Sequence, residues 1–83
     1  WGGEEFIVLL PDTNLEGAAE LADKVRAKVM NYSFASFDEI ISVSFSAGVS
    51  EMLANESLDD CIIEADKRLY KAKERGRNLV CTE

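Results

Sequence analysis

The chain has 83 residues, of which 47% are hydrophobic and 30% are charged, and its formal net charge is -7. This composition is typical of a small folded domain rather than a disordered segment, and the acidic balance argues against nucleic acid as a partner. No apolar run approaches the roughly 18 residues that cross a bilayer and nothing resembles a signal peptide, so we expect a cytoplasmic segment without direct membrane contact; a membrane anchor elsewhere in a longer parent stays open.

Three side-chain types narrow the chemistry further. Histidine is absent, which removes the commonest general base and most transition-metal sites, so acid or metal chemistry would use carboxylates. Cys61 and Cys81 each lie in an apolar stretch and are too far apart for a zinc site, so we expect buried, reduced thiols. Six of the nine basic residues fall in residues 67–77 with only Glu74 opposing them, a pattern that suits a small polyanion better than a duplex backbone.

The first half of the sequence predicts a strand followed by a helix. Residues 5–10 (EFIVLL) form a short apolar run that is stopped by Pro11, which favours a buried strand with cover on both faces. A helix is predicted over residues 14–31, with Thr13 and Glu16 as its capping box. Its apolar residues recur at three- and four-residue spacing: Leu15, Ala18, Ala22, Val25 and Val29.

The second half predicts another strand and another helix. In residues 40–52 apolar side chains alternate with serine and glycine, which is typical of a strand with one apolar face. Residues 31–39 before it are expected to be a connection. The second helix would begin at Ser57, whose side chain is paired with Asp60 in the cap signature, and would end where Gly76 supplies the C-cap.

A short strand over residues 79–81 completes the order strand, helix, strand, helix, strand. That alternation predicts an α/β fold, an α+β sandwich in which helices pack on a sheet. The glycine pair before the first strand is typical of a hairpin tip whose other arm lies upstream. We therefore expect residues 1–83 to be the C-terminal half of a single domain of roughly twice this length.

The candidate metal-binding residues lie at the start of the first strand. Adjacent glutamates in a strand point to opposite faces, so Glu4 and Glu5 could serve one site only if the chain turns sharply before them. Gly2 and Gly3 offer that turn and let a ligand approach the backbone closely. A carboxylate in this position is a suitable ligand for Mg²⁺. The alternative is a solvated hairpin without a ligand.

Two cations at the end of the second helix are candidates for phosphate binding. Lys73 and Arg77, four residues apart, would share one helical face, where lysine offers a point charge and arginine a planar fork for phosphate oxygens. The alternative is that both only complement the helix dipole. Together with a metal-binding carboxylate, they would form a nucleoside-triphosphate site.

Three motifs of this sequence resemble those of GGDEF domains, the bacterial diguanylate cyclases. WGGEEF at residues 1–6 matches the family signature in the variant with glutamate at the third motif position. SFSAGVS at residues 44–50 is similar to the family's strand that ends in a Ser-x-Gly-Val turn. ADKRLYKAKERGRN at residues 65–78 resembles the C-terminal helix motif. The motifs occur in the family's order and cover essentially the whole chain.

The resemblance implies that the complete domain condenses two GTP molecules into cyclic di-GMP and releases two pyrophosphates. It implies Mg²⁺ or Mn²⁺ as cofactor and a second GGDEF domain, in a homodimer, that presents the other GTP. Glu4 would be the metal ligand and a catalytic residue, and Glu5 a second catalytic motif residue. The nucleotide-binding residues that the resemblance implies are Gly2, Gly3, Lys73 and Arg77.

The family's upstream half is absent from these residues, and it normally carries another metal-binding aspartate and the guanine-recognising residues. We therefore expect the isolated chain to be inactive. One alternative is a catalytically silent module that binds GTP or cyclic di-GMP and regulates an attached domain. A second is a structural or dimerising α/β domain. An apolar edge left without its neighbouring strand would also favour dimerisation or strand exchange.

Overall fold

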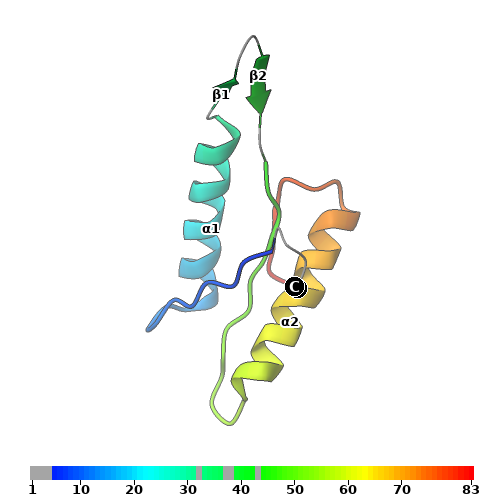
Figure 1. The fold of residues 1–83 in the computed structure, drawn as a ribbon. Coiled ribbons are helices and arrows are strands. Elements are labelled where there is room, and N and C mark those ends of the chain that lie inside the picture. The colour runs from blue at the N-terminus through cyan, green and yellow to red at the C-terminus, as the bar shows by residue number, and fades with distance from the viewer. Residues whose placement is uncertain (1–4, 32, 37–38, 43) are drawn as a thin grey trace.

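The chain folds into a mixed arrangement of helices and short strands. The computed structural model describes residues 5–31, 33–36, 39–42 and 44–83, and for 33–36 and 39–42 it describes the backbone alone. Along the chain the elements are α1 (Leu15–Met30), β1 (Ser33–Ser36), β2 (Glu39–Ser42), β3 (Ala47–Gly48), α2 (Leu58–Glu74) and β4 (Val80–Cys81) (Figure 1).

Two helices enclose a short parallel pair of strands. β3 and β4 pair in parallel, and the backbone N–H of Ala47 and of Val49 donate to the carbonyl oxygens of Leu79 and Cys81, each at 3.0 Å. α2 connects these strands and packs against both, while α1 contacts β4. The strands therefore run between the helices, and the antiparallel hairpin of β1 and β2 projects beyond the end of α1 (Figure 1).

The close approach of β3 to α2 depends on Gly48. A Cβ atom added there would collide with the backbone oxygen of Ala65 and the backbone nitrogen of Leu69. No side chain fits between this strand and the helix. Beside the contact, Ala72 is fully buried and Cys81 is 2% exposed, and these two form the buried core of the described residues.

Both helices begin at a capping side chain. Ser57 Oγ accepts from the backbone N–H of Asp60 at 3.1 Å, which confirms the predicted start of α2. At α1 the N-cap is Asn14, whose Oδ1 accepts from the N–H of Gly17 at 2.8 Å. The predicted cap at Thr13 is therefore wrong by one residue, because the Thr13 hydroxyl donates back to the carbonyl of Pro11 instead.

α2 ends in a glycine turn, as predicted. Arg75 is the C-cap, and Gly76 follows with φ +118°. The N–H of Gly76 donates to the carbonyl of Lys73 at 3.5 Å, and the N–H of Arg77 donates to that of Ala72 at 3.0 Å. This pair of bonds is the Schellman motif, which satisfies carbonyl groups that the helix leaves unpaired.

The strand predictions were less accurate. Residues 5–10 form no strand, and no described segment pairs with them; Phe6 is 89% exposed and Val8 is 74% exposed. The prediction of a buried strand there is wrong for this structure, because a strand needs a hydrogen-bonded neighbour as well as an apolar sequence. The single strand predicted over residues 40–52 divides into β2 and β3, with residues 44–46 in neither.

β1 lies in the segment that was expected to be a plain connection. Its pairing with β2 runs from Ser33 opposite Ser42 to Ser36 opposite Glu39. Both cysteines are free, as predicted, but the predicted burial is confirmed for Cys81 alone, since Cys61 is only partly buried. None of the described helices has both the length and the apolar content that a membrane crossing requires.

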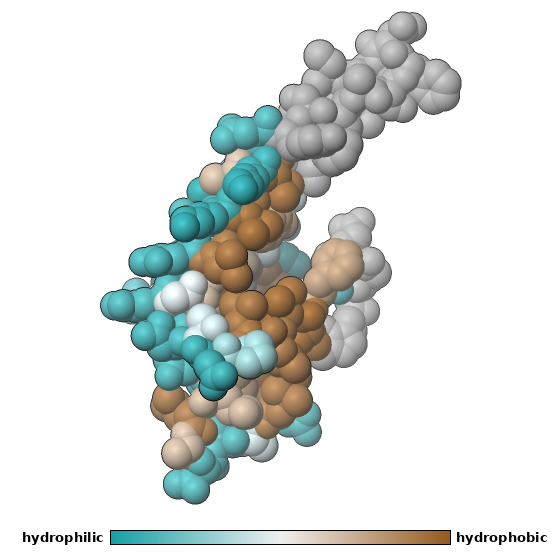
Figure 2. Space-filling model, turned by 90° about the vertical axis from the view of Figure 1, so that its left-hand side faces the viewer, coloured by the Kyte–Doolittle hydropathy of each residue, from teal (hydrophilic) through white to brown (hydrophobic). Residues whose placement is uncertain are grey.

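Figure 2 shows apolar side chains gathered in one band on the face that it presents, beside hydrophilic ones.

Candidate functional site

A cavity brings the segment after the Gly-Gly-Glu motif against α2. It measures about 230 Å³ and is lined by Glu5 from that segment and by four residues of α2. The helix residues recur at three- and four-residue spacing, so they lie on one face of α2. They are Asp66, Leu69, Tyr70 and Lys73.

The cavity combines negative and positive charge. Its lining residues include two that carry carboxylates, Glu5 and Asp66, and one that carries an ammonium group, Lys73. Lys73 is exposed, and among the described residues it forms no ion pair. Carboxylate oxygens are ligands that Mg²⁺ accepts, and a lysine ammonium is a common partner of phosphate. The cavity therefore offers both kinds of group that a metal-bound phosphate needs.

Tyr70 lies in this cavity rather than in the core. Tyr70 is 64% exposed, whereas Leu69 beside it is partly buried. Asp66 lines the same cavity. Their common signal in the sequence is the spacing of Asp66, Tyr70 and Lys73, which places all three on one helical face.

Arg77 does not share a helical face with Lys73. α2 ends at Glu74, and Arg77 lies beyond it in a left-handed conformation with φ +64°. The predicted pairing on a helix is therefore wrong, because the glycine turn redirects the chain before Arg77. Arg77 is exposed and is not among the residues that line the cavity with Lys73.

The remaining predicted site residues, Gly2, Gly3 and Glu4, lie outside the described residues. Within the described part of the chain, no group of three or more carboxylate or thiol side chains is placed to hold a metal ion. Glu5 and Asp66 have the hard oxygen donors that suit Mg²⁺, but a complete set of ligands would need further oxygen atoms. The donor chemistry fits such a metal when substrate phosphates supply part of the coordination.

A larger cavity of about 380 Å³ lies near the start of α1. Polar contacts among its lining residues hold the surrounding elements together. Glu51 Oε1 accepts from the backbone N–H of Leu15 at 2.8 Å. Arg68 Nη1 donates to the carbonyl of Val49 at 2.7 Å, and Nη2 lies 3.3 Å from Glu64 Oε1. These contacts join α1, α2 and the chain after β3, and they account for Glu51 and Arg68 as structural residues.

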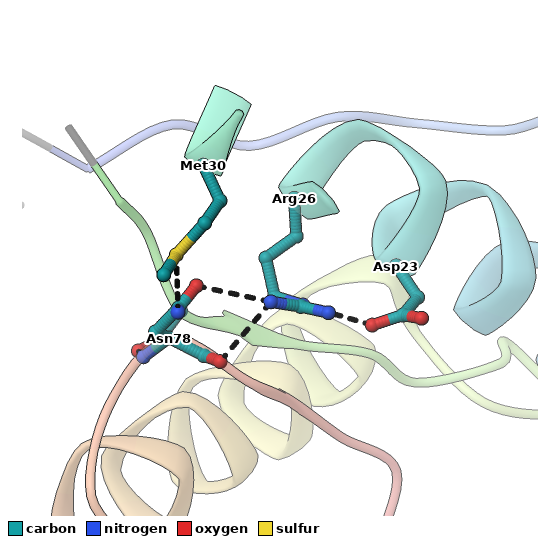
Figure 3. A network of polar contacts seen from close by, with 5 residues as sticks. Asp23, Arg26, Met30 and Asn78 are labelled. Atoms are coloured by element: carbon teal, nitrogen blue, oxygen red, sulfur yellow. Dashed lines mark hydrogen bonds and ion pairs between the residues drawn. The ribbon is translucent and has the colours of Figure 1, made fainter. Parts of the chain in front are cut away.

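A polar network that the sequence did not predict lies at the turn after α2. Arg26 Nη1 donates to Asn78 Oδ1 at 3.1 Å, and Arg26 Nε lies 2.8 Å from Asp23 Oδ1 (Figure 3). Asn78 Nδ2 donates to the sulfur of Met30, which is also in α1 (Figure 3). The two partners Arg26 and Asn78 are 52 residues apart in the sequence. Only their side-chain types, and not their spacing, could have indicated this contact.

Comparison with known proteins identifies the family. The model of the family described as "Diguanylate cyclase, GGDEF domain" matches residues 1–79. The chain is 41% identical over 80 residues to diguanylate cyclase DgcM of Escherichia coli, covering 96% of this chain and 19% of that protein. It is 40% identical over 78 residues to diguanylate cyclase DgcP of Pseudomonas aeruginosa, covering 94% of this chain and 12% of that protein.

A third relative carries a different kind of name. The response regulator PleD of Caulobacter vibrioides is 37% identical over 83 residues, covering 96% of this chain and 18% of that protein. The chain therefore spans about a fifth or less of the length of these relatives. With a family model matched from the first residue to Leu79, the chain belongs to the GGDEF family of diguanylate cyclase domains.

Proposed function

We propose that this chain supplies part of the metal and phosphate site of a diguanylate cyclase, an enzyme that condenses two GTP molecules into cyclic di-GMP and two pyrophosphates. The observation that carries the proposal is the cavity that Glu5 of the motif segment and Lys73 of α2 line together. Family membership, and relatives named as diguanylate cyclases, supply the reaction. The substrate would be GTP, and the partner a second GGDEF domain in a homodimer.

In this proposal the chain's residues bind and orient one GTP. Lys73, which lines the cavity, would bind a terminal phosphate, and Arg77 would bind the same phosphate group from the turn after α2. Glu4, with Glu5 beside it, would hold the metal ion, and Gly2 and Gly3 would allow the nucleotide to approach the backbone. When bound, Mg²⁺ or Mn²⁺ neutralises charge on the phosphates.

Positioning would account for most of the rate. The 3′-hydroxyl of one GTP attacks the α-phosphorus of the other, so the two nucleotides must be held in line. Glu4 is the proposed acceptor of the proton that the hydroxyl loses. Each domain would present one GTP, and this requires the two domains to face one another.

We further propose that residues 1–83 form the C-terminal half of one GGDEF domain and are inactive alone. What supports this is the segment of residues 5–10, where four large apolar side chains are exposed although the sequence is that of a buried strand. A neighbouring strand from the same domain would pair with this segment and cover it. Such a strand would belong to the half of the domain that carries the guanine-recognising residues.

The experiment is product formation by the complete domain supplied with GTP and Mg²⁺, with cyclic di-GMP identified by mass. We expect Glu4→Gln to lower kcat by about a hundredfold or more, because a proton acceptor and metal ligand is lost. Lys73→Ala should lower kcat/KM by roughly tenfold to a hundredfold, the loss of one charge-assisted hydrogen bond. Lys71→Ala removes another exposed lysine of α2 that does not line the cavity, and it serves as the matched control.

Two results would contradict the proposal. Normal turnover in Lys73→Ala would show that Lys73 does not bind the phosphate and would favour the alternative, in which it only complements the helix dipole. A folded, dimeric domain that binds GTP without forming product would instead support the catalytically silent module. In that case nucleotide binding by the Lys73→Ala variant still tests whether this cavity is the binding site.

A further inference from the structure

The turn after α2 has an unusual backbone. Gly76, Arg77 and Asn78 follow one another with φ of +118°, +64° and +51°. Glycine adopts positive φ without penalty and asparagine tolerates it, but a long side chain such as arginine is disfavoured there. Arg77 therefore keeps this conformation only because other contacts hold the turn on both sides of it.

Two of these contacts come from α2 and from the chain before β3. The N–H of Arg77 donates to the carbonyl of Ala72 at 3.0 Å, which ties the turn to the last part of the helix. On the other side, the N–H of Asn78 donates to Ser46 Oγ at 2.8 Å. These bonds fix the peptide groups on either side of Arg77.

The third contact comes from α1 and involves Arg26. Its Nη1 donates both to Asn78 Oδ1 at 3.1 Å and to the carbonyl oxygen of Asn78 at 3.4 Å (Figure 3). The guanidinium is itself oriented by Asp23, with Nε 2.8 Å from Asp23 Oδ1. The Arg26 side chain is 21% exposed, so these bonds are partly shielded from water. A planar group that is held at one edge can present its other edge in a fixed direction.

We propose that Arg26 is a positioning residue, which acts through Asn78 to fix the backbone from which Arg77 reaches the nucleotide phosphates. This inference rests on the proposed function, in which Arg77 binds phosphate. Arg26 itself would touch no substrate. Its two hydrogen bonds engage both the side chain and the carbonyl of the residue after Arg77, so the loss of Arg26 removes one of the three contacts that hold the turn at positive φ.

The test uses the intact protein with GTP and Mg²⁺ and compares Arg26→Ala, Arg77→Ala and the double variant. We expect Arg26→Ala to raise KM for GTP by about tenfold to a hundredfold, the range typical of outer-shell partners, and to change kcat much less. In the Arg77→Ala background the same substitution should have no further effect, because the group that Arg26 positions is already gone. Arg26→Lys keeps one donor and should recover part of the affinity.

Lys24→Ala is the matched control, since it removes an exposed positive charge from the same helix without touching Asn78. Its KM should equal that of the wild type. Additive losses in the Arg26→Ala, Arg77→Ala double variant would overturn the inference and make Arg26 a general structural contact. An unchanged KM in Arg26→Ala would overturn it as well. If Arg26→Ala does not fold, the same cycle is measured with Arg26→Lys, and additivity there is equally decisive.

A second readout separates this inference from the proposed function. The carbon chemical shifts of Arg77 and Asn78 report their left-handed backbone without any nucleotide. In Arg26→Ala, or in Arg26→Lys, we expect those shifts to move toward negative-φ values, while Lys24→Ala leaves them unchanged. If the wild-type protein fails to bind GTP, the proposed function falls. In that case the chemical shifts of Arg77 and Asn78 alone test whether Arg26 positions the turn. Unchanged shifts in the Arg26 variants would refute that role.

Discussion

Replacing Gly48 with alanine tests whether the contact between β3 and α2 organises the fold. The added Cβ would overlap the backbone oxygen of Ala65 and the backbone nitrogen of Leu69, and it would lie 2.8 Å from the backbone carbon of Arg68. All three atoms belong to the backbone of α2. None can rotate aside as a side chain could, so the strand and helix must separate.

The expected cost follows from that separation. Overpacking a well-packed interior costs about 1 to 3 kcal/mol, and we expect the upper end because the obstacle is backbone. The complete domain is expected to be about twice the length of this chain, and for a domain of about 150 to 250 residues 1 kcal/mol shifts the melting temperature by about 2 to 4 °C. Gly48→Ala in the complete domain should therefore lower Tm by roughly 6 to 12 °C.

The assay is thermal and urea unfolding followed by far-ultraviolet circular dichroism. Gly17→Ala is the matched control, because its added Cβ would meet only the side chains of Thr13 and Asn14, each at 3.2 Å. We expect that variant to differ from the wild type by no more than about 1 kcal/mol, since alanine also favours the helix. A Gly48→Ala protein that melts within about 2 °C of the wild type would refute the packing of β3 on α2.

Two further predictions concern the ends of α2. Ser57→Ala should lower the free energy of unfolding by about 1 kcal/mol, because the backbone N–H of Asp60 loses its capping acceptor, and urea unfolding measures the loss. Ser57→Asp keeps an acceptor and should retain stability. Equal losses in both variants would contradict the capping role. Gly76→Ala should cost about 1 to 2 kcal/mol from the positive φ alone, because no atom lies within 4 Å of the added Cβ. Glu74→Ala, at an exposed helix position, is its control and should change stability by less than about 0.5 kcal/mol.

The helices could be predicted from the sequence because their signals are local. Ser57 caps its own helix three residues away, and Gly76 ends that helix two residues after its last residue. The cap of α1 was misplaced because Thr13 and Asn14 are both good capping residues, and their types alone do not determine which of them turns toward the helix. That choice is made by the backbone around Pro11, whose carbonyl binds the Thr13 hydroxyl.

The strands were harder to predict, because each strand needs a second segment to pair with and the sequence of one segment does not show which segment that is. Residues 5–10 have a strand's composition but no described neighbour, whereas Ser33–Ser36 has only two apolar residues and becomes a strand by pairing with Glu39–Ser42. Pairing of this kind joins separate segments, so periodicity within one segment cannot predict it. The α/β class was nevertheless predictable, because it requires only the alternation of element types.

For the candidate site, the sequence indicated which residues to consider but not how they are arranged in space. The sequence indicated Lys73 through its spacing to Arg77, whereas in the structure Lys73 lines a cavity with Glu5 and Asp66. The position of Arg77 could not be predicted, since a four-residue spacing was interpreted as continued helix across Gly76. The contact between Arg26 and Asn78 depends on how α1 packs against the end of α2, which is a tertiary fact.

The parallel pairing of β3 with β4 has a consequence for the order in which the protein folds. Ala47 and Val80 are paired across the whole of α2, so the two strands cannot meet until that helix has brought their ends together. Helices form in about a microsecond, while closing a long loop carries an entropy cost that only later contacts offset. Strands of two residues each offer few such contacts. The pair of β3 and β4 should thus be the last element to form and the first to open, and its opening would take from the turn at Arg77 the contact with Ser46 while both helices are still intact.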